Sequence, residues 1–191
     1  MRRTDRMTDL GFRFMVAAFR LQDALFPYID RRVGGFGLAS GMTVVDYGCG
    51  PGRYTLRFAR LVGEAGKVYA VDIQELAVEA VRRLAARQRL DNVEVVLARG
   101  YDTGLPAAVA DRVCAIDMFF AVRDPGAFLA EIFRLLKPDG LFILDDGHQS
   151  RSATRAKLAA SGVLEIVEET RDHLTCRKRP GAKERPPVSG Q

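Results

Sequence analysis

The chain has few cysteines and no long apolar run, and these shortages exclude several classes of protein. Its three cysteines, Cys49, Cys114 and Cys176, are widely spaced and do not follow zinc-ligand spacing. Cys114 and Cys176 lie in strand-like runs, where we expect them to be buried. No apolar stretch approaches the length of a membrane span, and none follows the basic start Met1-Arg2-Arg3 as a secretory signal would require. We therefore expect a cytoplasmic protein without a membrane span.

The net charge of +5 belongs to the two ends of the chain. Residues 1–32 hold seven Arg and four Asp, and residues 177–191 hold five basic residues and one Glu. Residues 33–176 hold 17 basic and 19 acidic residues, so the central segment is slightly acidic. Basic ends can bind phosphates, but more often they are solubilising or disordered. We favour the second interpretation, which argues against a nucleic-acid partner.

The most informative segment is a glycine-rich turn between an apolar strand at residues 42–45 and a helix at residues 53–61. Its sequence is Asp46-Tyr47-Gly48-Cys49-Gly50-Pro51-Gly52. Glycine permits positive φ and a close approach of a ligand to the backbone, and a helix start leaves N–H groups free for a ligand. Asp46 stands at the carboxyl end of the strand, where open α/β sheets bind their ligands. The alternative is a tight turn that binds nothing.

The spacing of these glycines separates two kinds of nucleotide-binding turn. The dinucleotide fingerprint is G-x-G-x-x-G, but here the third glycine comes one position early, at Gly52. The pattern D-x-G-x-G-x-G instead resembles the first motif of class I S-adenosylmethionine-dependent methyltransferases. Residues 67–73 look like the second strand of that family, and residues 135–143 look like the segment that leads into its fifth strand. The resemblance covers about residues 40–178.

The resemblance implies S-adenosyl-L-methionine as cofactor and assigns residues to it. The glycine-rich turn, Gly52 included, would bind the cofactor. Backbone groups of Gly48, Cys49 and Gly50 would contact the methionine part of the donor. Asp46 would orient the donor's ammonium group. Asp72 would accept both ribose hydroxyls, because one carboxylate offers two oxygens, and Ile73 would pack on adenine. The alternatives are a turn-capping role for Asp72 and simple core packing for Ile73.

The third motif departs from the family pattern. Relatives often have an acidic residue directly after the third strand, where it contacts the adenine amino group. Here Arg99-Gly100-Tyr101-Asp102 follows that strand, and Asp102 comes about two positions late. Either Asp102 binds adenine, or Tyr101 stacks on it, or neither does.

Two segments at the ends of strands four and five are the candidates for the acceptor site. Asp117 ends strand four, where donor and acceptor meet in the family, so we assign it to both cofactor binding and catalysis. Phe119 and Phe120, which follow it, would form apolar walls. His148 comes after strand five and is a candidate general base, because histidine changes protonation near neutral pH. It could instead be an exposed loop residue. The neighbouring Asp145 and Asp146 give only a weak indication of a metal, and we predict none.

Strands and helices alternate along the rest of the chain. Apolar runs predict strands at 68–72, 93–98, 113–118 and 141–145, helices at 74–90, 126–136 and 152–160, and a closing hairpin from 164–170 and 173–179. We expect a turn at Asp139-Gly140, and Gly162 should end the helix at 152–160. In the first helix, at 53–61, we expect Leu56 and Leu61 to face inward. His173 beside the hairpin turn should be structural. The predicted fold is α/β: a doubly wound, mostly parallel, seven-stranded Rossmann-like sheet with an antiparallel C-terminal hairpin.

Three domains are expected along the chain. Residues 1–39 form an N-terminal helical lid, with an amphipathic helical segment at 10–32, or else pack simply against the sheet. Residues 40–179 form the S-adenosylmethionine-binding methyltransferase domain. Residues 180–191 form a disordered basic tail.

The identity of the acceptor stays open, and three functions compete. The favoured function is methyl transfer to a small molecule. The second is methylation of RNA or protein through the basic ends, although no Asn-Pro-Pro-Tyr-like motif stands at strand four. The third is a nucleotide-binding Rossmann protein without methyl transfer. Nothing in the sequence indicates the oligomeric state or whether N, O, S or C is methylated.

Overall fold

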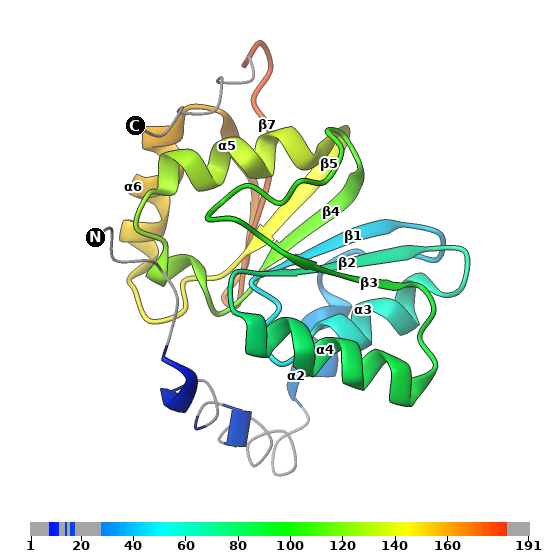
Figure 1. Cartoon of the computed structure of the whole chain (residues 1–191). Coiled ribbons are helices and arrows are strands. Elements are labelled where there is room, and N and C mark those ends of the chain that lie inside the picture. Colours follow the sequence, from blue (N-terminus) through cyan, green and yellow to red (C-terminus); the bar gives the residue numbers. More distant parts are fainter. Residues whose placement is uncertain (1–7, 12–13, 15, 18–27, 183–191) are drawn as a thin grey trace. The chain divides into compact units, whose positions relative to one another are not determined.

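A computed structural model describes residues 8–11, 14, 16–17 and 28–182 of the chain (Figure 1). The chain divides into two compact units: the first ends at Leu97 and the second begins at Ala98. The seven strands of the described residues follow the order β3-β2-β1-β4-β5-β7-β6. This order, with an antiparallel hairpin at the C-terminal end, confirms the predicted Rossmann-like α/β fold.

The first unit consists of three parallel strands with helices packed along them. Asp46 in β1 lies opposite Ala70 in β2, and Asp72 at the end of β2 lies opposite Leu97 in β3. Four of the five β1 residues are buried, as expected for a parallel strand covered on both faces. Helices α3 and α4 pack along these strands (Figure 1). The elements are α2 (Tyr28–Gly34), β1 (Thr43–Tyr47), α3 (Thr55–Val62), β2 (Lys67–Asp72), α4 (Glu75–Gln88) and β3 (Val93–Leu97).

The inward face of α3 differs from the prediction. Leu61 is 45% exposed and Leu56 is only partly buried. The buried residues of the helix are instead Thr55, Phe58, Ala59 and Val62. Their spacing of i, i+3, i+4 and i+7 places them on one stripe of a 3.6-residue helix, and the two leucines flank that stripe.

The second unit contains parallel and antiparallel pairs. Strand β4 pairs in parallel with β5, while β7 pairs antiparallel with both β5 and β6. Helix α5 packs on β4 and β5, and α6 lies beside α5 and β6 (Figure 1). The elements are β4 (Ala110–Ala115), the 3₁₀ helix η1 (Phe119–Ala121), α5 (Pro125–Leu135), β5 (Leu136–Leu144), α6 (Arg151–Ser161), β6 (Leu164–Glu169) and β7 (Leu174–Lys178).

Local signals set the ends of the two helices in this unit. The Asp124 side chain accepts a hydrogen bond from the amide of Ala127, and a proline opens α5 at its first position. The Ser150 hydroxyl caps α6 in the same way, and Gly162 ends α6 in the left-handed conformation. The predicted glycine stop of α6 is therefore confirmed.

Two strand boundaries differ from the prediction. Strand β4 ends at Ala115, so Asp117 lies beyond it rather than within it, with a positive φ of 59°. Strand β5 begins at Leu136, and the predicted Asp139-Gly140 turn is a bulge within it, because the pairing with β4 slips at this point. A Cβ at Gly140 would lie 2.8 Å from the carbonyl oxygen of Ala110, so only glycine fits there.

Much of the predicted lid and tail lies outside the described residues. This applies to residues 1–7, 12–13, 15 and 18–27 of the lid, and to residues 183–191 of the tail. Within the predicted amphipathic segment at 10–32, Leu10 is 80% exposed and Phe14 is 77% exposed. The domain boundaries therefore stay predictions. None of the helices within the described ranges combines the length and hydropathy that a membrane crossing needs.

Candidate active site

The glycine-rich loop of the first unit is fastened to the end of β2 by its own amides. The N–H groups of Gly48 and Cys49 donate to the Val71 carbonyl at 2.8 and 3.0 Å. The Gly50 N–H donates to Asp72 Oδ2 at 2.9 Å. These three N–H groups are therefore engaged within the protein. The backbone contacts predicted from Gly48, Cys49 and Gly50 to the donor would come from their carbonyl oxygens.

The glycines of this loop serve different purposes. A Cβ at Gly50, which has a φ of +51°, would meet no atom of the described residues within 4 Å. A Cβ at Gly52, with a φ of +85°, would lie 3.1 Å from Cγ2 of Val81 in α4. Gly50 thus borders open space that a ligand can fill, whereas Gly52 permits the close approach of α4 to the loop.

Cys49 is a core residue rather than a reactive one. Its side chain is 5% exposed and packs with Ala70 and Val81. Burial, reinforced by the charges of Asp72 and Asp46, raises the pKa of the Cys49 thiol well above its usual value. The thiol therefore stays protonated and is no nucleophile. Cys114 and Cys176 are also buried, as predicted, and none of the three cysteines forms a disulfide.

Asp46 is a buried carboxyl group at the carboxyl end of β1. It is 2% exposed and accepts a hydrogen bond of 2.5 Å from the hydroxyl of Thr55. Burial raises the pKa of Asp46 from 3.8 to about 7; the hydrogen bond from Thr55 opposes this shift, and the charge of Asp72 adds to it. A carboxyl group with a pKa near neutrality can ionise when a cation approaches, which suits a residue that meets an ammonium group.

Asp72 has both carboxylate oxygens held in place by the backbone. Oδ1 accepts the N–H of Gln74 at 2.8 Å, and Oδ2 accepts the N–H of Gly50 at 2.9 Å. Burial raises the pKa of Asp72, although these amides act to lower it. The amide of Ile73 also stabilises the carboxylate. A carboxylate has about four lone-pair sites, so Asp72 keeps capacity for a hydroxyl donor of a ligand. The next residue, Ile73, is partly exposed and offers an apolar surface.

The sequence does not reveal one contact beside Asp72. Gln74 is buried, and its side-chain amide donates to Oδ1 of Asp9 at 3.0 Å. This hydrogen bond ties the N-terminal segment around Asp9 to the end of β2. The two residues are 65 positions apart, and no sequence motif connects them.

Asp102 belongs to the second unit, where it forms a small turn. Its Oδ1 accepts the N–H of Gly104 at 2.9 Å, and its side chain is exposed. Tyr101 packs edge-on against Phe128, and its hydroxyl accepts the N–H of Asp124 at 3.1 Å. Tyr101 therefore fastens this loop to the start of α5, while contact of Asp102 with adenine stays a prediction.

The acidic residues after β4 and β5 differ in burial. Asp117 is exposed and lies beyond the end of β4, so its predicted place within the strand at 113–118 is wrong. The buried carboxylate is Asp145, whose Oδ1 accepts the N–H of Asp117 at 2.9 Å. This bond holds the left-handed backbone of Asp117 and links the two loops that follow the strands.

The same two loops meet again at His148 and Phe120. Their rings contact edge to face, with centroids 4.8 Å apart and an interplanar angle of 81°. A Cβ at Gly147 would lie 2.3 Å from the Phe120 ring, so the loop after β5 is pressed against η1. His148 itself is exposed. Phe119 is fully buried and packs against Phe128, so only Phe120 can form a wall of an open site.

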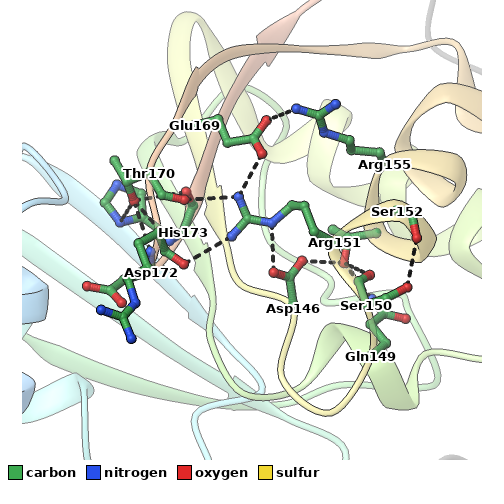
Figure 2. Close-up of polar contacts among 12 residues, drawn as sticks. Asp146, Gln149, Ser150, Arg151, Ser152, Arg155, Glu169, Thr170, Asp172 and His173 are labelled. Atoms are coloured by element: carbon green, nitrogen blue, oxygen red, sulfur yellow. Dashed lines mark hydrogen bonds and ion pairs between the residues drawn. The ribbon is translucent and has the colours of Figure 1, made fainter.

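The remaining acidic group of this region is engaged by its own loop and helix. Asp146 accepts hydrogen bonds from Arg151 Nε at 2.7 Å and from the Thr154 hydroxyl at 2.6 Å (Figure 2). Within the described residues, no three His, Cys, Asp or Glu side chains gather in a way that could hold a metal ion. His173, near the hairpin turn, is buried and contacts the Thr170 hydroxyl through Nδ1, as expected of a structural residue.

Comparison with known families identifies the class of protein. The family described as "Methyltransferase domain" matches residues 38–178. Because this match covers more than half of the chain, the chain belongs to this methyltransferase family.

Solved structures agree with this fold. A SAM-dependent methyltransferase from Aquifex aeolicus is 27% identical with a TM-score of 0.73, and the match covers 77% of this chain and 87% of that one. A structure from Methanococcus maripaludis has a TM-score of 0.75 over 96% of this chain and 99% of that one, but at 17% identity it shows the fold alone.

Relatives with assigned activities match about half of the chain. Nocamycin O-methyltransferase from Saccharothrix syringae is 38% identical over 100 residues, which are 52% of this chain and 36% of that protein. The ubiquinone/menaquinone biosynthesis C-methyltransferase of Escherichia coli strain K12 is 34% identical over 109 residues, which are 56% of this chain and 43% of that protein. The matched segment therefore spans less than half the length of either relative.

Proposed function

We propose that this protein is an S-adenosyl-L-methionine-dependent methyltransferase that acts on a small-molecule acceptor. Membership of the methyltransferase family supports the reaction class. The names of two relatives, nocamycin O-methyltransferase and ubiquinone/menaquinone biosynthesis C-methyltransferase, support a small acceptor. The observation that carries the proposal is the Asp72 carboxylate, which Gly50 and Gln74 hold beside open space at the carboxyl end of β2.

The first unit has a place for each polar part of the donor. Asp72 accepts the two ribose hydroxyls with the lone pairs that the backbone leaves available. Ile73 offers its partly exposed side chain to adenine. Asp46 receives the ammonium group. A cationic group needs acceptors, so a loop whose amides are consumed inside the protein suits it well.

Methyl transfer requires little of the protein beyond the placement of the donor and the acceptor. Bound S-adenosyl-L-methionine supplies a methyl group on a sulfonium, which a nucleophile of the acceptor displaces directly. The residues of this chain align the two partners and exclude water. His148 removes a proton if the acceptor arrives as a hydroxyl or protonated amine, and Asp117 contacts donor or acceptor at the neighbouring loop. An acceptor that is already a nucleophile needs no base and reacts by proximity alone.

Calorimetric titration tests the donor site. We expect S-adenosyl-L-methionine and S-adenosylhomocysteine to bind and NAD not to bind. Asp72→Ala should weaken donor binding by about 1–3 kcal/mol, the usual loss for a hydrogen bond to a charged group. Asp91→Ala is the matched control, because Asp91 is an exposed aspartate in the turn before β3. Equal donor affinity in wild type and Asp72→Ala would refute the ribose assignment, and binding of NAD alone would refute the reaction class.

Labelled donor tests the class of acceptor. The protein is incubated with cell extract and S-adenosyl-L-methionine that carries a labelled methyl group. The extract is then separated into metabolite, RNA and protein fractions. Label in the metabolite fraction is the expected result. Label confined to RNA or protein would overturn the small-molecule proposal while leaving the donor assignment intact.

A further inference from the structure

A single arginine at the start of α6 joins three segments of the second unit. Figure 2 shows the Arg151 guanidinium between the loop after β5 and the turn of the β6–β7 hairpin. Its Nε donates to Asp146 Oδ2 at 2.7 Å, and its Nη1 donates to the Thr170 carbonyl at 3.0 Å. Nη1 also lies 3.1 Å from Glu169 Oε1, and Nη2 donates to the Arg171 carbonyl at 3.3 Å.

This geometry requires arginine rather than any cation. The planar guanidinium can point separate N–H groups at acceptors in different directions, which a lysine ammonium on a flexible stem does less well. The Arg151 side chain is 24% exposed and that of Asp146 is 21% exposed, so solvent screens this pair less than a surface pair. The hydrogen bonds and charges of Asp146 and Glu169 raise the pKa of Arg151 against the effect of its burial.

The other oxygen of Asp146 is also held. Thr154, a fully buried residue one turn into α6, donates its hydroxyl to Asp146 Oδ1 at 2.6 Å. The Gln149 side-chain amide donates to the same hydroxyl at 2.9 Å, and the Gln149 N–H donates to the Asp146 carbonyl at 3.2 Å. The short loop from Asp146 to Gln149 is therefore pinned at both ends.

His148 lies within this pinned loop. On one side the loop is held by Arg151 through Asp146, and on the other Gly147 and His148 press against Phe120. An exposed side chain has many rotamers, and a mobile loop would add backbone conformations to them. A catalytic base on this loop therefore benefits from a loop with a fixed conformation.

We infer that Arg151 is a positioning residue that fixes His148 against Phe120 by tying Asp146 to the β6–β7 hairpin. The catalytic part of this inference rests on the proposed function, whereas the positioning itself does not. Among the described residues of the second unit, the polar contacts of Arg151 run to Asp146 and to the hairpin and do not include the imidazole of His148. Its effect on turnover must therefore pass through the loop.

The chain offers a direct readout of the position of His148, because it contains two histidines. An imidazole packed against the Phe120 ring experiences a ring-current shift in its NMR signal, and the signal that a His148→Gln variant lacks is that of His148. Arg151→Gln should move this signal toward the position of a free histidine. Arg151→Lys should move it part of the way, and Asp146→Asn should move it as Arg151→Gln does.

Arg155→Gln is the matched control. Arg155 is an arginine one turn along α6 that pairs with the same partner, Glu169, but does not contact Asp146. It should leave the His148 signal in place. If Arg151→Gln does not fold, Asp146→Asn and Arg151→Lys report on the same link. An unmoved His148 signal in the folded variants overturns the inference, and so does an equal movement in Arg155→Gln.

Kinetics test the catalytic consequence. Arg151→Gln should lower kcat about ten-fold or more while donor affinity stays within about two-fold, because misplacing a catalytic group costs rate rather than binding. In a His148→Ala background the same substitution should cost almost nothing further, since two changes that act through one group are not additive. Full additivity would overturn the positioning role. Absence of donor binding in the wild type would instead refute the proposed function and leave the NMR result standing.

Discussion

The buried carboxyl group of Asp46 should make both the stability of the protein and its donor binding depend on pH. The perturbation is Asp46→Asn, which keeps the size of the side chain and an oxygen for the Thr55 hydroxyl but removes the titration. In the folded protein without ligand, burial raises the pKa of Asp46 from 3.8 to about 7. Each pKa unit corresponds to about 1.4 kcal/mol, so the ionised form carries a penalty of about 4 kcal/mol above neutrality.

The sign of the effect follows from linkage. Because the folded state holds the proton more tightly than the unfolded state, the stabilisation is complete below pH 4 and is lost as pH rises through 7. The wild-type free energy of unfolding should therefore fall by about 2–3 kcal/mol between pH 5 and pH 8 through Asp46 alone. The raised pKa of Asp72 acts in the same direction and persists in the variant, so the difference between the two proteins isolates Asp46.

Denaturant titrations at several pH values measure this difference. Thr55→Val provides a second perturbation, because it removes the hydrogen bond that lowers the pKa of Asp46 and should move the transition to higher pH. Parallel stability curves for wild type and Asp46→Asn would refute the reasoning, since they would mean that Asp46 titrates alike in the folded and unfolded states.

Donor binding provides an independent measurement of the protonation of Asp46. If the donor's ammonium group requires the carboxylate, binding must expel the proton that the ligand-free protein carries. About half a proton should be released for each donor bound at pH 7, about 0.9 at pH 6 and about 0.1 at pH 8. Calorimetry in two buffers of different ionisation enthalpy counts these protons. No release at pH 6 would exclude the contact between Asp46 and the ammonium group.

Three further predictions follow from the site and the tail. Gly50→Ala should mainly weaken donor binding, whereas Gly52→Ala should mainly lower the melting temperature, because its Cβ would lie 3.1 Å from Val81. Thermal melts and donor titrations measure the two effects, and the opposite pattern would contradict the prediction. His148→Ala should lower kcat about a hundred-fold with donor affinity unchanged, and normal turnover would leave catalysis by proximity alone. Removal of residues 180–191 should leave the melting temperature nearly unchanged, and a drop of many degrees would show that the tail is folded.

The fold was predictable because its signals are local and repeated. Buried strands ending in Asp46 and Asp72 stand out as apolar runs with an acidic end, and Gly162 marks the end of α6. The errors arose where a tertiary contact overrides the local pattern. Asp117 looks like part of an apolar strand, but the chain turns before it, and its amide is taken by Asp145. The Asp139-Gly140 turn became a bulge because β5 starts pairing earlier than its apolar run suggests.

The residues predicted for the donor and those predicted for the acceptor differ in how well the sequence identifies them, and the reason is chemical. The donor is a fixed molecule, so the residues for it recur as a motif: an acid, alternating glycines and a second acid. The motif does not reveal which backbone groups are used inside the protein, and the structure shows that the amides of this turn hold Asp72 and the end of β2. The acceptor differs between methyltransferases, so the residues that bind it follow no comparable motif.

For the loop that carries His148, the structure reveals a set of supporting contacts rather than another reactive group. The loop that carries His148 is short and glycine-containing, and alone it would not hold an exposed imidazole in one place. Arg151 and Thr154 satisfy both oxygens of Asp146, while Phe120 receives the opposite side of the loop. The antiparallel hairpin supplies three of the acceptors around that arginine, from Glu169, Thr170 and Arg171. The hairpin that distinguishes this fold from other doubly wound sheets therefore contributes directly to the placement of the candidate base.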